Sequence, residues 1–172
     1  VQPATTASKA VNAPPGQVAI QDAHGNTVTG AKEPVTIEFL TGTGKTGATL
    51  FGTKTVNPVN GVASFTDLNV DSAGTGFQLQ ATSTNSLTLA NSAAFAVTAG
   101  AATQLVYQVQ PGSVLAQQTF SPTVQVFVAD ALWNLGSPAT NSISSTVTPG
   151  TGTTGARVAG RQTVAGSGGV GT

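Results

Sequence analysis

Apolar and polar residues alternate along short stretches of the chain between residues 1 and 100. The apolar residues that recur at every second position are Val18, Ile20, Val35, Ile37, Phe39, Phe77, Leu79, Ala81, Phe95 and Val97. A period of two predicts strands with one buried and one solvated face. Turn-forming sequences separate these stretches at 22–26, 58–61, 71–76 and 110–113. The spacing predicts an all-β fold, an antiparallel β-sandwich without helix.

The same alternation predicts the core of this sandwich. For residues 1–100 we expect about seven to eight strands, the usual number for a domain of this size. The expected core side chains are Val18, Ile20, Val35, Ile37, Phe39, Phe65, Leu68, Phe77, Leu79, Phe95 and Val97.

A long segment of the sequence occurs twice. TGATLFGTKTVNPVNGV at 46–62 returns as TGARVAGRQTVAGSGGV at 154–170, and the shift of 108 residues continues upstream without a gap. Under this shift Asp22 falls on Asp130, and Asn26 falls on Asn134. A period of this length suits a domain with its own core rather than a short solenoid unit.

The repeat also locates the domain boundaries. ATQLVYQVQP at 102–111 is typical of an opening strand and follows a short hinge, TAGAA, at 98–102. We therefore place one domain at residues 1–100 and a second at 101–172. We expect the first to lack most of its opening strand and the second to be incomplete at its C-terminal side. Either the array continues in further sequence, or a strand from a neighbouring copy completes it by donor-strand complementation.

Composition and charge narrow the function classes. Only 7% of the residues are charged and the formal net charge is zero, so no basic surface is expected to bind nucleic acid. The chain has no cysteine, which leaves no disulfide and no thiolate nucleophile. No apolar run is long enough to predict a membrane span. No cofactor is expected.

Few residues suggest catalysis or metal binding. Asp22 and Asp130, with the pair Asp67 and Asp71, suggest calcium, but a carboxylate that caps a turn explains an Asp equally well. His24 is the only histidine, so neither a histidine metal site nor a Ser-His-Asp triad is expected. The GTGKT at 42–46 lacks the first glycine of a phosphate loop, because Phe39 stands there. The sequence therefore predicts no enzyme.

One aromatic turn predicts a contact surface. Trp133 stands where the first repeat has Gly25, and Leu132 precedes it. An exposed Leu-Trp pair favours coverage by a neighbouring domain or subunit, and Tyr107 on the predicted opening strand is a further candidate. The alternative is that the turn folds back and lays the ring over its own sandwich.

Several quoted stretches together resemble a known family. GQVAIQDAHGNTVTG, VTIEF, NGVASFTDLNVDSAGTGFQLQATS and AFAVT are similar to the bacterial immunoglobulin-like repeats of large secreted and surface proteins, of the invasin and intimin type. The resemblance covers residues 1–100 and the partial second repeat. Where many such repeats have Tyr after GTG, this chain has Phe77, so a tyrosine corner is not expected there.

The resemblance implies tandem immunoglobulin-like sandwiches, an extracellular or cell-surface location and a structural, non-catalytic role. Such modules serve as stalks, adhesin spacers or filament subunits, and their partners are copies of themselves or adjacent repeats. The alternative is a carbohydrate-binding β-sandwich with glycans as partners. One Trp and one Tyr make a small aromatic platform for that function.

Overall fold

The computed structural model describes residues 5–7, 16–84, 87–135, 142–165 and 170–171. The start of the first predicted domain at 1–4 and part of the repeated segment, 166–169, lie outside these residues. The chain divides into two compact units, Val1–Gly100 (unit 1) and Ala101–Thr172 (unit 2). All regular structure in the described residues is β-strand, as the alternation predicts.

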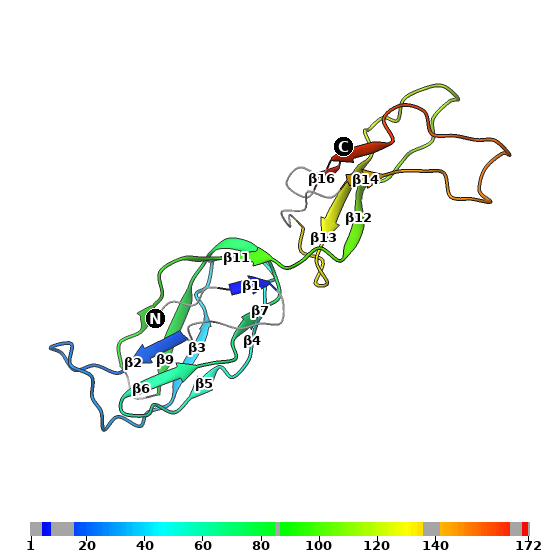
Figure 1. Cartoon of the computed structure of the whole chain (residues 1–172). Coiled ribbons are helices and arrows are strands. Elements are labelled where there is room, and N and C mark those ends of the chain that lie inside the picture. Colours follow the sequence, from blue (N-terminus) through cyan, green and yellow to red (C-terminus); the bar gives the residue numbers. More distant parts are fainter. Residues whose placement is uncertain (1–4, 8–15, 85–86, 136–141, 166–169, 172) are drawn as a thin grey trace. The chain divides into compact units, whose positions relative to one another are not determined.

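Unit 1 contains more and shorter strands than the sequence predicts. They are β1 (Thr5–Ala7), β2 (Gly16–Ala19), β3 (Val35–Phe39), β4 (Leu50–Phe51), β5 (Thr55–Val56), β6 (Val62–Phe65), β7 (Asn69–Val70), β8 (Gly74–Phe77), β9 (Leu79–Ser83), β10 (Ala90–Asn91) and β11 (Phe95–Ala99). They form sheets in the orders β1-β11-β8, β10-β9-β3-β5, β2-β6 and β4-β7 (Figure 1). The arrangement is consistent with a β-sandwich.

The pairing in unit 1 is antiparallel with one exception. β1 runs parallel to β11, with Thr5 beside Val97, Thr6 beside Thr98 and Ala7 beside Ala99. The prediction of an antiparallel fold is therefore wrong for this pair. β1 comes early in unit 1 and β11 comes at its end, so the two chain-terminal strands of the unit lie side by side (Figure 1).

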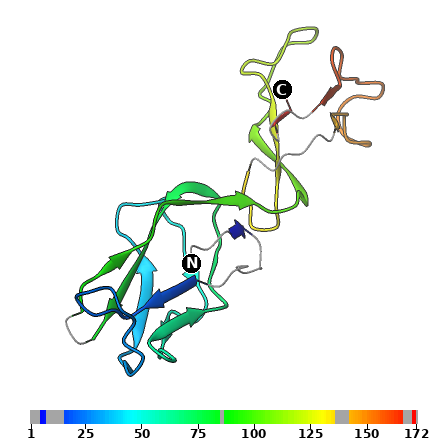
Figure 2. The same cartoon turned by 60° about the vertical axis from the view of Figure 1, so that its left-hand side comes forward.

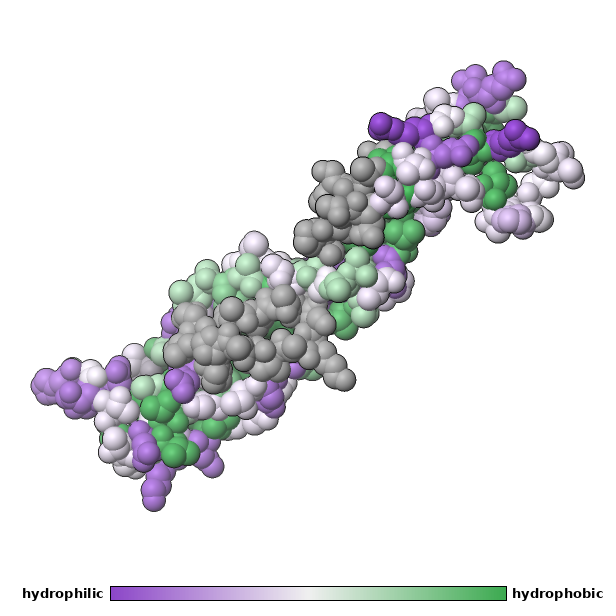
Figure 3. All heavy atoms as spheres, viewed as in Figure 1, coloured by the Kyte–Doolittle hydropathy of each residue, from purple (hydrophilic) through white to green (hydrophobic). Residues whose placement is uncertain are grey.

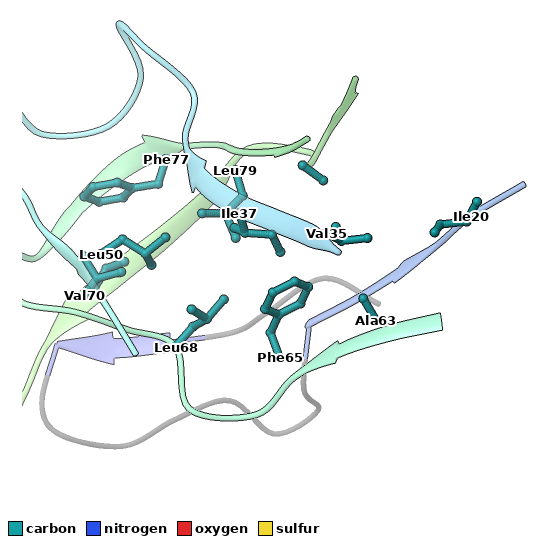
Figure 4. Close-up of a cluster of buried hydrophobic side chains, with 12 residues drawn as sticks. Ile20, Val35, Ile37, Leu50, Ala63, Phe65, Leu68, Val70, Phe77 and Leu79 are labelled. Atoms are coloured by element: carbon teal, nitrogen blue, oxygen red, sulfur yellow. The ribbon is translucent and has the colours of Figure 1, made fainter. Parts of the chain in front are cut away.

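The core of unit 1 lies between β2-β6 and β9-β3. Phe65 points from β6 toward Ile37 and Val35 of β3 (Figure 4). The predicted core is confirmed for most of its members, whereas Val18, Phe39 and Phe95 are only partly buried against it. Leu50, Ala63 and Val70 belong to the core without having been predicted, and Ala81, one of the alternating apolar residues, is buried with them.

The alternating residues Phe77, Leu79 and Ala81, which the pattern assigns to one strand, lie on two strands. β8 ends at Phe77 and pairs with β11, whereas β9 begins at Leu79 and pairs with β3. Gln78 separates them because its backbone N–H donates to Thr43 Oγ1 at 3.2 Å and its carbonyl accepts from Leu40 at 2.9 Å. The predicted turn at 71–76 is also too long, since β8 begins at Gly74.

Unit 2 contains fewer strands, joined by long loops. They are β12 (Gln104–Val109), β13 (Gln125–Ala129), β14 (Ser142–Ser144), β15 (Thr163–Ala165) and β16 (Val170–Gly171). The strand orders are β12-β13-β16 and β14-β15. Residues 110–124 and 145–162 form extended loops between these strands (Figures 1 and 2).

Strand registers in the two units agree under the shift of 108 residues. In unit 1 Val18 pairs with Ala63 and Ala19 with Val62; in unit 2 the equivalent residues pair, Val126 with Gly171 and Phe127 with Val170. β3 and β5 pair Val35 with Val56, and β14 and β15 pair Ile143 with Val164. Even a cross-strand hydroxyl bond recurs, between Thr36 and Thr55 at 2.9 Å and between Ser144 and Thr163 at 3.0 Å.

Candidate interaction surfaces

The turn that carries Trp133 is built on the carboxylate of Asp130. Oδ1 accepts the backbone N–H groups of Leu132 and Asn134 at 2.8 and 2.9 Å, and Oδ2 accepts the side-chain amide of Asn134 at 3.1 Å. Asp130 and Asn134 are both buried. A carboxylate that accepts backbone N–H groups two and four residues later fixes the turn without tertiary help.

The equivalent turn in unit 1 repeats these bonds on an exposed surface. Oδ1 of Asp22 accepts from His24 and Asn26, both at 2.9 Å, and Oδ2 accepts the Asn26 amide at 3.1 Å. The backbone and side-chain hydrogen bonds from Asn26, followed by the one from His24, hold the pKa of Asp22 below its ordinary value. His24 lies in this turn, away from any group of potential metal ligands among the described residues.

Trp133 occupies a backbone conformation that favours glycine. Its φ is 64°, and Gly25 at the equivalent position has φ 84°. The Trp133 side chain is 66% exposed and that of Leu132 is 46% exposed. The alternative in which the ring folds over its own sandwich is therefore wrong. The backbone strain and the exposed indole make this turn a candidate contact surface.

Tyr107 lies on β12, outside the turn that carries Trp133. It pairs directly with Val126, whose equivalent Val18 packs against the core of unit 1. Tyr107 is nevertheless 50% exposed. Together with Val126, Ile143 and Val164 it lines a groove of about 450 Å³ in unit 2. Figure 3 shows hydrophobic residues of unit 2 at the surface beside hydrophilic ones.

Asp67 and Asp71, which suggested calcium, accept hydrogen bonds from the residues on either side of β4. Asp67 accepts the backbone N–H of Thr53 at 3.0 Å and its hydroxyl at 2.7 Å, and Asp71 accepts the backbone N–H of Thr49 at 2.8 Å. The Thr53 hydroxyl, followed by its backbone N–H, lowers the pKa of Asp67. Within the described ranges, no three His, Cys, Asp or Glu side chains come together as metal ligands would.

Gly44 of the GTGKT stretch packs against the core. A Cβ on Gly44 would lie 2.2 Å from Cδ1 of Phe77, so the backbone lies flat against that buried ring. The close approach to the Phe77 ring therefore explains the glycine at position 44.

Unit 1 has two adjoining grooves along β2 that no residue-level motif predicted. They measure about 510 and 260 Å³ and lie between β2 and the strands β9 and β10. The residues common to both grooves are Val18, Ala19, Gln21, Ala81 and Ala90. We call this combined feature the β2 groove.

No protein-family model, no curated protein and no solved structure matches this chain. In the part of the chain that the structure describes, no helix has the length and apolarity to cross a membrane.

Proposed function

We propose that this chain is a structural, non-catalytic repeat module of an extracellular bacterial surface protein or filament. Its two units are tandem immunoglobulin-like sandwiches, and its partners are adjacent repeats or copies of itself. The resemblance of 1–100 to bacterial immunoglobulin-like repeats supports this assignment. The registers and turn bonds that recur after 108 residues support the equivalence of the two units.

The parallel pairing of β1 with β11 is the observation that supports a load-bearing role for this chain. When the two ends of unit 1 are pulled apart, β1 is drawn backward from its start and β11 forward from its end. Because these strands are parallel, the two forces slide them past each other along their length. The hydrogen bonds between them then carry the load together, whereas a pair pulled open from one end breaks its bonds one after another.

Single-molecule stretching tests this role. We expect unit 1 to unfold in one event at high force when the whole chain is pulled by its ends. Thr6→Pro and Ala7→Pro, made separately, should lower that force, because proline cannot donate a ladder hydrogen bond and residues 6 and 7 face alternate edges. The matched control is Ile37→Val, a buried change that costs about 1 kcal/mol of stability without touching β1.

Two results would count against the load-bearing role. The first is a rupture force unchanged by both proline variants. The second is a loss of force in Ile37→Val as large as in the proline variants, since global stability would then explain the resistance. Surface location is tested separately, by labelling intact producing cells with an antibody against the chain before and after external protease treatment.

The carbohydrate-binding alternative is favoured by one observation, the exposed indole of Trp133. A flat aromatic side chain held out from a rigid turn suits stacking on a sugar ring. Glycan-array binding that disappears in Trp133→Ala and persists in Leu115→Ala would support this function. Leu115 is the matched control because it is 80% exposed in the same unit.

A further inference from the structure

The outer edge of β2 has no strand beside it among the described residues, because β2 pairs with β6 alone. The backbone N–H of Ile20 donates to the Gly61 carbonyl at 2.9 Å, so this N–H points to the edge of β2 that faces β6. Alternation along a strand then directs the backbone groups of Gln17 and Ala19 to the opposite edge. That edge presents N–H and C=O groups in the spacing that a further strand would use.

The β2 groove runs along this same edge. Leu87 and Leu89 line it and are 38% and 57% exposed, whereas Leu50, Leu68 and Leu79 of the same unit are buried. Among the described residues that line the groove, Asp22 alone is charged. The groove therefore suits an uncharged strand with apolar side chains on one face.

Unit 2 shows which strand fits the equivalent edge. β13, the equivalent of β2 under the shift of 108 residues, pairs on that edge with β12. The Thr103 N–H donates to the Ala129 carbonyl at 2.8 Å, and Val106 lies opposite Phe127. Moved to unit 1, the same register sets Val106 of a β12-type strand opposite Ala19.

The side chains of β12 match the groove in this register. Leu105 lies opposite Val128 and Tyr107 opposite Val126 in unit 2. The equivalents of these partners are Ile20 and Val18, which face the interior of unit 1. Directly opposed residues in an antiparallel pair share a face, so Leu and Tyr of the incoming strand would enter the β2 groove. β12 carries no charged residue.

We propose that the β2 groove binds a strand with the sequence pattern of β12, supplied by another repeat of the same kind. This inference rests on the proposed function, because it takes the two units as equivalent repeats. The strand adds antiparallel to the free edge of β2, buries its Leu and Tyr side chains against Leu87 and Leu89, and joins one repeat to the next by β-augmentation.

Disulfide trapping tests the register. The chain has no cysteine, so Ala19→Cys introduces a single thiol into the full chain. The probe is a synthetic peptide of residues 102–111 that carries Val106→Cys. Opposed Cα atoms of such a pair lie about 5.5 Å apart, within the range that a disulfide spans. We expect rapid cross-linking with this peptide and at least about tenfold slower cross-linking with a peptide that carries Leu105→Cys on the opposite face.

Affinity measurements with the unsubstituted peptide and the full chain test the groove. Leu89→Glu should weaken binding about tenfold or more, because it places a charge where the groove buries an apolar side chain. The matched control is Val59→Glu, since Val59 is 74% exposed in unit 1 and lines neither groove. In the peptide, Tyr107→Ser should weaken binding, whereas Val106→Thr should not.

Three results would overturn the proposal: no measurable binding, equal cross-linking of both cysteine peptides, or equal loss of affinity in Leu89→Glu and Val59→Glu. Circular dichroism and thermal melting of each variant establish that it is folded. Failure of peptide binding with an intact mechanical response would leave the structural role standing and remove only this mode of joining. Peptide binding by a chain that shows no mechanical resistance would remove the load-bearing role and leave this mode of joining standing.

Discussion

Asp22 and Asp130 make the same set of hydrogen bonds in different surroundings. Asp22 and Asn26 are exposed whereas Asp130 and Asn134 are buried, yet the donor positions and the bond lengths agree within about 0.1 Å. A short Asx turn therefore depends on its own five residues and not on its environment. This is why an Asp and Asn four residues apart could be recognised as a turn from sequence alone.

The first prediction concerns the pH dependence of unit 1. Hydrogen bonds lower the pKa of Asp22 in the folded chain, so the folded state binds fewer protons than the unfolded state. The stability that Asp22 contributes is present above its unfolded pKa of about 3.9 and is lost as the pH falls through the lower folded pKa. Asp22→Asn should reduce the acid-induced loss of stability, measured by denaturant unfolding at neutral and acidic pH. An equal acid sensitivity in parent and variant would contradict this assignment.

The second prediction concerns the Trp133 turn. Trp133→Gly replaces a strained residue by the one that unit 1 uses at this position, and the exposed ring contributes little burial. The gain from relieved strain and the entropic cost of glycine each amount to about 1 kcal/mol, so the free energy of unfolding should change by less than that. Denaturant unfolding of unit 2 measures it. A loss of several kcal/mol would mean that the indole packs within the unit.

At the scale of elements, Phe77 connects strand geometry to the core. It is fully buried, its ring centroid lies 5.4 Å from that of Phe39 and 5.8 Å from that of Phe95, and it packs on the backbone of Gly44. The period-two pattern identified Phe77 as core but did not show that the strand breaks immediately after it. The break depends on Thr43, a residue far away in the sequence, so no local pattern contains it.

The third prediction follows from this packing. Phe77→Ala should lower the free energy of unfolding by about 3–5 kcal/mol, since it removes a buried ring and leaves a cavity between Phe39 and Phe95. Phe51→Ala is the control, because Phe51 is 48% exposed. Chemical denaturation, followed by far-ultraviolet circular dichroism, measures the free energy of unfolding of both variants. A loss in free energy of unfolding below about 1 kcal/mol for Phe77→Ala would show that Phe77 does not belong to the core.

For the whole molecule, the alternation of apolar and polar residues predicted most of what the structure confirms. The all-β class and most of the unit 1 core were predicted from alternation, because buried strands leave that pattern wherever one face is solvated. The parallel β1–β11 pair and the β2 groove were not, because both depend on which distant strands become neighbours. The exposure of Tyr107 likewise depends on which distant strands cover its face of β12.

The fourth prediction concerns salt. With 7% charged residues and no net charge, the chain has few exposed ion pairs for salt to screen. The melting temperature should therefore differ little between low salt and about 1 M sodium chloride. Differential scanning calorimetry measures this. A large shift would show that charge interactions contribute more to stability than their number indicates.

From the parallel β1–β11 pair we expect unit 1 to be mechanically anisotropic. A load along the chain shears that pair, but a load applied sideways through the turn at 22–26 would peel β2 from β6 starting at one end. The same domain would then be stiff in the direction of its chain and compliant across it. A fibre made of such units would bend and recover under lateral flow while it resists extension.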